Sequence, residues 1–322
     1  MQTQQVPGTA AASAPIALLP TERLHTRILR VPLMIWRAMT TSPRVALGSA
    51  IVGFFILVGL FGPFFMPYDP NATSSLFIAS PSASHLLGTT VVGQDIFSQL
   101  IYGTRTSVFW GLGTGVLVTL LSILVGMVGG YFGGGIDDAL TLLTNVSLVL
   151  PALPLAIVLA AYFPRGPLTI SLVIVVTNWA WQARVLRSQT LSMRSREFVT
   201  AARASGERPW RIIFFEIFPN EIGLVVAGFV STTIYVILTW AALEFLGLGD
   251  GTIPSWGGML YWAQQAGALG GGLWWWFIPP GACIAILGAG LSLINFGIDE
   301  IADPRLRPER PVKLAKIKKA VA

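Results

Sequence analysis

The chain has 322 residues, of which 53% are hydrophobic and only 11% charged, and its mean hydropathy is +0.69. Soluble domains carry about 25% charged residues, so this composition excludes a soluble globule and indicates a membrane protein. The single cysteine, Cys283, excludes a disulfide framework and a cysteine-based metal site, and we interpret it as a small packed residue. The two histidines, His25 and His85, lie far apart with no carboxylate cluster nearby, so we expect no metal or catalytic role for either.

The amino-terminal region divides into two parts before the first apolar run. Residues 1–21 are rich in Gln, Thr, Ala and Pro, which predicts a disordered cytoplasmic tail and not a cleaved signal peptide. Residues 22–44 are amphipathic, with Arg23, Arg27 and Arg30 on one helical face. This pattern predicts an interfacial helix on the inner leaflet, where arginines meet anionic headgroups. A helix that packs on a partner subunit is an equal alternative.

Six apolar runs are long enough to cross a hydrocarbon core of about 30 Å. They are Val45–Tyr68, Thr106 to about Val128 within Thr106–Ile136, Ala139–Tyr162, Leu168–Leu186, Ile222–Leu243 and Trp274–Ile298. We therefore predict an all-α membrane protein with six transmembrane helices. Residues 45–104 form the first transmembrane helix and an outer loop, residues 105–301 form a five-helix core domain, and residues 302–322 form a basic cytoplasmic tail.

The basic residues predict the orientation in the membrane. Lys and Arg gather in the amino-terminal flank, in residues 184–211 and in the carboxyl-terminal tail, whereas the loops at 69–105 and 244–273 share one, Arg105. Both termini and the region around residue 200 are therefore expected in the cytoplasm, which requires an even number of spans. The loop Gly133–Asp138 should also lie inside, although its only charged residues are acidic. Acidic residues influence topology little. This placement along a membrane argues against a nucleic-acid partner.

A polar, charged segment between two apolar runs predicts a helix–turn–helix elbow. Glu197–Ser205 contains neither Gly nor Pro and is rich in alanine, a strong helix former. Gly206 supplies the left-handed residue that commonly ends a helix. Pro209 suits the first turn of a second helix, Trp210–Phe218. Pro219 is then expected to end that helix and to mark the turn into the next apolar run.

These residues resemble a family signature. Ala201-Ala202, Gly206 and Phe218-Pro219 are similar to the EAA signature of importer-type ABC permeases, and the longer pattern resembles the peptide and nickel branch. The chain departs from it at Thr200, where the signature has Glu, and at Glu216-Ile217, where the usual Ile is shifted by one position. In that family the elbow, residues 194–219 here, is the coupling helix that docks on a cytoplasmic ATPase. The resemblance implies the following ATPase-coupling residues: Glu197, Ala201, Ala202, Arg203, Gly206 and Pro219.

The outer loops and the tail carry the same resemblance. The segments LGT…GQD, FLGLG, PSWGGML and DPRLR follow the family's order from about Arg44 to Arg307, and they resemble the second-permease type of dipeptide and oligopeptide importers. Family members usually have Arg or Lys where this chain has Gln94, and many have Ser where it has Glu244. The resemblance implies the type I importer permease fold.

Four residues are candidates for the substrate path: Pro151, Pro154, Trp240 and Glu244. The two prolines should kink the third run, and kinks line the path in some transporters but are also ordinary in membrane helices. A carboxylate near the outer end of a span is costly unless it is hydrated or paired. Glu244 therefore either lines the route and meets a substrate amino group, or lies at the interface, where it is hydrated or bonded to a neighbour.

Glycines and tryptophans each leave two interpretations open. Gly111/Gly115 and Gly126/Gly130 are spaced by four, which predicts faces for close helix packing, with a gating hinge as the alternative. The tryptophans of the outer loops indicate an interfacial aromatic belt, whereas stacking on sugar rings would suit an oligosaccharide substrate. These tryptophans are Trp256, Trp262, Trp274, Trp275 and Trp276.

The function that the resemblance implies is import by alternating access across a prokaryotic plasma membrane. The implied partners are a homologous second permease, two cytoplasmic ABC ATPase subunits or domains, and an extracytoplasmic substrate-binding protein. The sequence has no phosphate-binding P-loop motif, so we expect no cofactor in this chain and assign ATP and Mg to the ATPases. Short peptides are the leading substrate, with oligosaccharides and nickel complexes as alternatives.

Two rival classes of function explain less of the sequence. An intramembrane enzyme would need clustered catalytic residues, and the predicted spans contain neither His nor Asp. A self-contained channel would leave the cytoplasmic elbow unexplained.

Overall fold

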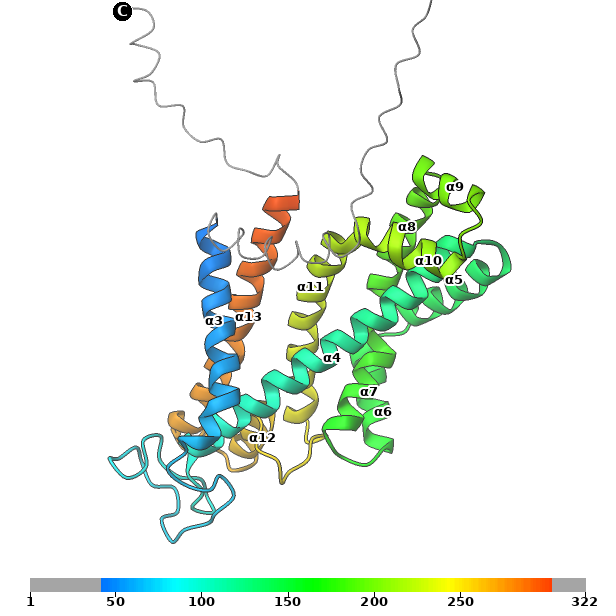
Figure 1. The fold of residues 1–322 in the computed structure, drawn as a ribbon. Helices are drawn as coiled ribbons and strands as arrows, with labels where there is room; N and C mark the ends of the chain where they lie inside the picture. Colours follow the sequence, from blue (N-terminus) through cyan, green and yellow to red (C-terminus); the bar gives the residue numbers. More distant parts are fainter. Residues whose placement is uncertain (1–41, 303–322) are drawn as a thin grey trace, which may run out of the picture.

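The computed structural model describes the backbone of residues 42–302 and the side chains of residues 42–298. The predicted tail at 1–21, most of the interfacial helix at 22–44, His25 and the basic tail beyond Ala302 lie outside the described residues. The described chain is a bundle in which the start of α3, the end of α13 and the predicted elbow lie at the same end (Figure 1).

The described residues form helices and no strand, apart from one isolated antiparallel bridge between Thr89 and Asp95. The helices are α3 (Pro43–Phe61), η1 (Gly62–Phe64), α4 (Ile96–Phe132), α5 (Gly134–Val149), α6 (Ala152–Tyr162), α7 (Pro167–Asn178), α8 (Ala180–Arg194), α9 (Glu197–Ala204), α10 (Pro209–Arg211), the π-helical η2 (Ile212–Ile217), α11 (Phe218–Phe245), α12 (Trp256–Gln265) and α13 (Trp274–Ala302). Four helical stretches are long and apolar enough to cross a membrane, or five if the bent pair α5–α6 is one span. The all-α prediction is confirmed, and the count of six stays a prediction.

Helix α4 runs diagonally across the bundle and packs on α3, α7, α8 and α11 (Figure 1). Its 37 residues correspond to about 55 Å, well beyond a hydrocarbon core of about 30 Å. The predicted start at Thr106 is wrong, because Asp95 caps a helix that begins at Ile96. The carboxylate of Asp95 accepts a hydrogen bond from the backbone amide of Ser98 at 2.8 Å.

The glycine pairs of α4 mark its two closest helix contacts. Gly111 and Gly115 face α11, and Gly126 and Gly130 face α8. A Cβ atom added to Gly126 would lie 2.5 Å from the carbonyl oxygen of Ala183, a distance that real Cβ atoms do not show. The interpretation of these faces as close-packing surfaces is therefore confirmed.

Two of the predicted spans are broken. The third run bends by 90° between α5 and α6, since Leu150 is extended and Pro151 starts the next helix. The predicted kink is confirmed at Pro151, and Pro154 lies in the first turn of α6. The fourth run divides at Trp179 into α7 and α8, a break that apolarity alone did not indicate.

The predicted stop at Pro219 is wrong. A helical stretch continues from Pro209 to Phe245, with Pro219 in the first turn of α11. The preceding six residues, Ile212–Ile217, are π-helical. In a regular helix the ring of Pro219 would clash with the carbonyl four residues before it, and its missing N–H would cost one backbone hydrogen bond. The wider π turn changes the hydrogen-bond register just before this proline.

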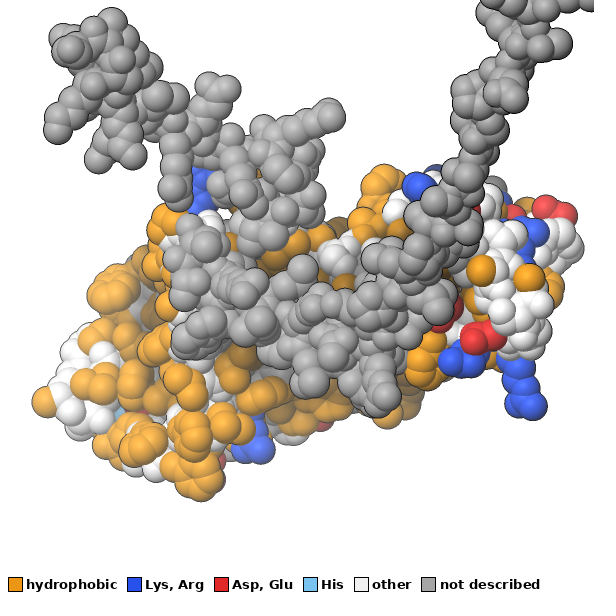
Figure 2. All heavy atoms as spheres, turned by 45° about the horizontal axis from the view of Figure 1, so that its top comes forward, with side chains coloured by type: hydrophobic (Ala, Val, Ile, Leu, Met, Phe, Trp, Pro, Cys, Tyr) orange, Lys and Arg blue, Asp and Glu red, His pale blue; other side chains and the backbone are white. Residues whose placement is uncertain are grey.

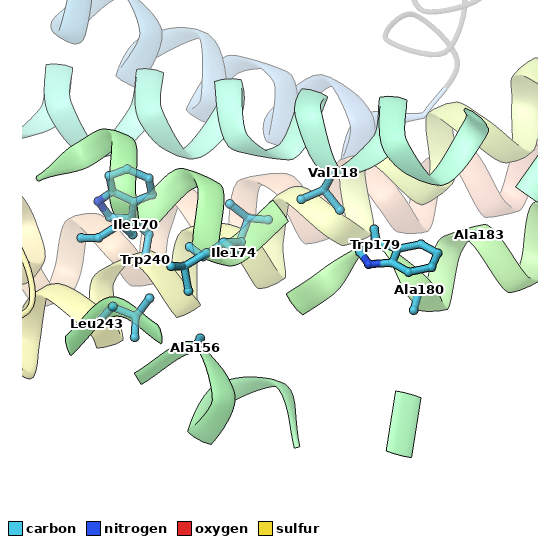
Figure 3. Packing of buried hydrophobic residues seen from close by; sticks show 12 residues of the cluster. Val118, Ala156, Ile170, Ile174, Trp179, Ala180, Ala183, Trp240 and Leu243 are labelled. Carbon is cyan, nitrogen blue, oxygen red and sulfur yellow. The ribbon is translucent and has the colours of Figure 1, made fainter. Parts of the chain in front are cut away.

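Buried side chains from α4, α6, α7, α8 and α11 form one hydrophobic cluster (Figure 3). Trp240 lies in this cluster at 1% exposure and stacks on Trp110 with ring centroids 6.0 Å apart. The predicted aromatic belt is wrong for Trp256 and Trp276, which are buried, whereas Trp262 and Trp274 are half exposed. The residues of α12 (Trp256–Gln265) were predicted to belong to an outer loop, but this helix folds against α11 and α13. Trp256 and Trp276 therefore pack between helices.

A polar cluster fastens the outer loop to the start of α4. Nδ1 of His85 lies 2.8 Å from Oδ1 of Asp95, and both side chains are buried. The ring of Tyr68 stacks on His85 at 4.7 Å, and the hydroxyl of Ser98 donates to Asp95 at 2.7 Å. His85 therefore does have a carboxylate partner, Asp95, ten residues further along the chain. In a catalytic triad the histidine lies between the hydroxyl and the carboxylate. Here the carboxylate lies between the histidine and the serine, so the arrangement fastens a loop instead.

We predict that Asp95→Ala lowers the apparent melting temperature of the purified protein. The change removes the cap of α4 and leaves His85 and Ser98 without their shared partner, a loss of roughly 1–3 kcal/mol. The measurement is thermal unfolding in detergent, with Asp69→Ala as the control, since Asp69 is exposed and makes one local hydrogen bond, to Asn71. Equal melting temperatures for Asp95→Ala and the control would contradict the locking role.

Candidate functional site

The elbow (residues 194–219) has the predicted helix–turn–helix form. Helix α9 ends at Ala204, and Gly206 adopts a φ of +75°. The amide of Glu207 donates to the carbonyl of Ala202 at 3.1 Å, which closes the left-handed turn. The space around Gly206 is open, so its backbone conformation is the reason that glycine is needed.

The underside of the elbow is an apolar anchor. Val199, Ile212, Ile213 and Ile217 have no exposed area, and they form one cluster with residues of α4 and α8. The guanidinium of Arg203 lies over the ring of a buried tyrosine of α4, Tyr131, at 4.8 Å from its centroid. Helix α9 therefore packs directly against α4 and α8.

Four aromatic side chains of the elbow remain exposed, and we refer to them as its outer side, although one of them, Trp210, also packs edge-on against Phe132 of α4. Trp210 and Phe214 stack with centroids 6.0 Å apart, and both remain about half exposed, as do Phe198 and Phe215. In the view of Figure 2, blue and red side chains gather on the right of the molecule, and many hydrophobic side chains lie on the uncovered surface to the left. This exposed aromatic surface with charged surroundings has the character of a protein contact.

The six residues expected to couple to an ATPase are all on or beside this elbow. Glu197 and Ala201 are exposed, and Glu197 borders a cavity of about 640 Å³ at the α8–α9 junction. Ala202 packs on the anchor, whereas Pro219 continues the helix below it. The hydroxyl of Thr200 donates to the carbonyl of Arg196 at 2.8 Å, so this departure from the signature is satisfied within α9.

Two polar contacts tie α8, the helix that leads into the elbow, to the rest of the bundle, and neither was predicted from the sequence. Arg187 of α8 donates to Asp137 of α5, with Nη2 and Oδ2 2.7 Å apart. Thr190 of α8 donates at 2.9 Å to the buried carboxylate of Glu221 at the start of α11. The acidic segment after Gly133 therefore meets a basic side chain of α8, which accounts for acidic residues on the side expected to be basic.

A cavity of about 540 Å³ lies where the two broken runs meet. Apolar side chains supply most of its wall, and we call it the polar cavity for the amide and hydroxyl groups that lie among them. Its walls come from the α5–α6 break, from the α7–α8 break and from α11. The lining residues are Ser147, Leu148, Leu150, Pro151, Ala152, Thr177, Asn178, Ala180, Trp181, Gln182, Ser231, Thr232 and Tyr235. None of these side chains carries a formal charge.

Gln182 is the most enclosed polar group of this cavity. Its Oε1 accepts hydrogen bonds from Thr119 and Thr232, and its Nε2 has no partner among the described residues. The site can therefore offer amide and hydroxyl groups to an uncharged polar ligand, with Trp181, 69% exposed, as an aromatic surface.

The candidate path residues do not come together at this cavity. Pro151 lines it, but Pro154, Trp240 and Glu244 do not. Trp240 is enclosed in the core, and Glu244 lines a separate small cavity at the other end of α11. Through the described part of the chain, no three His, Cys, Asp or Glu side chains gather as a metal ion would require.

An all-helical fold with several apolar helices of membrane-spanning length defines a multi-pass membrane protein. Residues 119–308 match the family described as the binding-protein-dependent transport system inner membrane component, and residues 33–81 match the N-terminal TM domain of oligopeptide transport permease C. The chain belongs to the binding-protein-dependent transport system inner membrane component family.

Similar proteins support the same assignment. The chain is 31% identical over 288 residues to the oligopeptide transport system permease protein OppC of Bacillus subtilis, covering 87% of this chain and 93% of that protein. It is 30% identical over 274 residues to the dipeptide transport system permease protein DppC of B. subtilis, covering 84% and 85%. It is 32% identical over 224 residues to the nickel transport system permease protein NikC of Escherichia coli, covering 69% and 80%.

We predict that a cysteine at Ser231 reacts with a membrane-impermeant thiol reagent. Ser231 lines the polar cavity and is exposed, so water and reagent should reach it. The experiment uses a Cys283→Ala background, with Ser122→Cys as the control, because Ser122 is fully buried. Equal labelling of both positions, or labelling of Ser122→Cys alone, would contradict a hydrated cavity.

Proposed function

We propose that this chain is the permease subunit of an ATP-driven, binding-protein-dependent importer of short peptides, and that it moves its substrate by alternating access. The single observation that carries the proposal is the elbow, whose outer side is exposed and aromatic while its underside is locked into α4 and α8. Such an element transmits a push from a cytoplasmic partner into the bundle. A self-contained channel has no use for it.

The proposed partner at the elbow is a cytoplasmic ABC ATPase. Exposed aromatic residues beside arginines suit a cleft on another protein, because aromatic and Arg side chains dominate protein interfaces. The ATPase-coupling residues in this proposal are Glu197, Ala201, Ala202, Arg203, Gly206 and Pro219. ATP and Mg bind in the ATPases, and this chain supplies no enzymatic step.

The proposed topology has six crossings with both termini and the elbow in the cytoplasm. The elbow, the start of α3 and the end of α13 lie at one end of the bundle, as this topology requires (Figure 1). The remaining crossings are then α5–α6 and α7–α8, each broken beside the polar cavity. The other proposed partners are a homologous second permease and an extracytoplasmic binding protein.

Peptides are the proposed substrates because the relatives named for oligopeptide and dipeptide transport cover most of the chain. The polar cavity supports this choice, since its uncharged amide and hydroxyl groups match the polarity of a peptide backbone. An oligosaccharide would also find hydroxyl partners and Trp181 there. A nickel complex remains the alternative suggested by the nickel permease relative.

We predict that Gly206→Val reduces transport at least about tenfold while membrane insertion stays normal. A β-branched residue at a φ of +75° costs roughly 1–2 kcal/mol and distorts the turn. Uptake of a labelled tripeptide and ATP hydrolysis are measured together, and the rate of hydrolysis should no longer vary with the rate of uptake. The control is Gly267→Val, which has a φ of +66° and open space but lies in the loop after α12. Normal transport by Gly206→Val would count heavily against coupling through the elbow.

We also predict that the gently solubilised chain co-purifies with a second permease and an ABC ATPase. The exposed elbow aromatics should hold the ATPase, so Trp210→Ala should weaken its recovery and leave the permease bound. Mass spectrometry of the purified material measures both. Recovery of the chain alone under gentle conditions would favour the channel.

A further inference from the structure

A second, smaller cavity lies at the opposite end of α11 from the elbow, under the loop that joins α11 to α12. It has a volume of about 80 Å³. Its charged lining residues are Arg165, Glu244 and Asp250. Unlike the polar cavity between the broken helices, this one is lined by charged side chains.

Glu244 is the enclosed acid of this cavity. It is 5% exposed, and its Oε2 has no hydrogen-bond partner among the described residues. Glycines let the loop close over it, since a Cβ at Gly249 would lie 3.0 Å from Cγ of Glu244 and one at Gly257 would lie 2.7 Å from its Cβ. The fold therefore encloses a carboxylate that it leaves incompletely satisfied.

The surroundings of Glu244 add negative charge. It lies in the last turn of α11, where the helix dipole is negative, and the amide of Gly247 closes that turn on the Glu244 carbonyl at 2.9 Å. Asp250 lines the same cavity, and the hydroxyl and amide of Thr252 donate to it and hold the pKa of its carboxyl below the usual value. Asp250 is therefore ionised at neutral pH.

No basic side chain in the described part of the chain lies within ion-pair distance of Glu244. Arg165 lines the same cavity, but none of the ion pairs found among residues 42–298 involves Arg165 or Glu244. A buried carboxylate without an oppositely charged partner is unfavourable, and a cation supplied from outside removes that cost. The cavity thus has the features of a cation site: an enclosed acid, a second acid and a helix carboxyl terminus.

We propose that this cavity binds the terminal ammonium group of the substrate, with Glu244 as its main partner. The volume decides which part of a substrate enters, because a water-sized group needs about 30 Å³ and a whole residue needs far more. An ammonium and its donors fit a space of about 80 Å³, whereas the rest of a peptide stays outside. This inference rests on the proposed peptide transport.

The test compares trialanine with N-acetyl-trialanine, which lacks the ammonium, in vesicles that contain the complete transporter and its binding protein. We expect Glu244→Gln to lower trialanine uptake by about tenfold, the effect of one charge-assisted hydrogen bond, and to leave N-acetyl-trialanine uptake unchanged. The same change at the other end of α11, Glu221→Gln, should leave the ratio of the two uptakes at its wild-type value. Because each comparison uses the same binding protein, its own preference for either peptide cancels.

An equal effect of Glu244→Gln on both peptides, or an unchanged ratio, would overturn the ammonium site. A second measurement uses the wild-type complex, so that a folding defect of the variant cannot decide the result. A hydrophobic carbodiimide is allowed to modify Glu244, and mass spectrometry quantifies the adduct. Protection by trialanine but not by N-acetyl-trialanine is expected, and protection by both or by neither contradicts the site. If the wild type carries neither peptide, the proposed substrate class fails, and the protection result still judges the site.

Discussion

The close approach of α4 to α8 and α11 is the contact on which the other features depend. Lipid offers no hydrophobic drive between apolar helices, so their association relies on short packing distances. Gly126 and Gly130 provide these distances against α8, and Gly111 and Gly115 provide them against α11. A single helix thereby fixes the two elements that carry the elbow and most of the polar cavity.

The elbow uses this rigid frame in two ways. Its apolar underside continues the α4–α8 packing, so α9 sits on the frame instead of on a flexible loop. The Arg187–Asp137 pair and the Thr190–Glu221 hydrogen bond add connections from α8 to α5 and to α11. The elbow is therefore connected to α4 and α8, and through α8 to α5 and α11. Helices α5 and α8 each adjoin a helix break beside the cavity.

The polar groups that line the two cavities differ in type. Around the α5–α6 and α7–α8 breaks they are amides and hydroxyls, and Gln182 is held by Thr119 and Thr232. At the other end of α11 they are acids, one of them enclosed under glycines. Broken helices accommodate the first kind because their free backbone groups already line a hydrated space. The second kind requires a partner, which is why the proposed ammonium site falls there.

The sequence by itself determined the helical class, the apolar runs, the elbow turn and the packing glycines. These follow from local rules, because composition, a left-handed residue at Gly206 and small residues spaced by four act through neighbouring backbone. The tertiary structure decided the start of α4 at Asp95, the continuation of the helix through Pro219, the burial of Trp240 and Trp256, and the gathering of Pro151 and Gln182 at one cavity. Each of these depends on partners far along the chain. Asp95 meets a histidine from the outer loop, and the cavity forms only where two broken helices face α11. The hydrophobic periodicity within a single segment carries no information about such contacts.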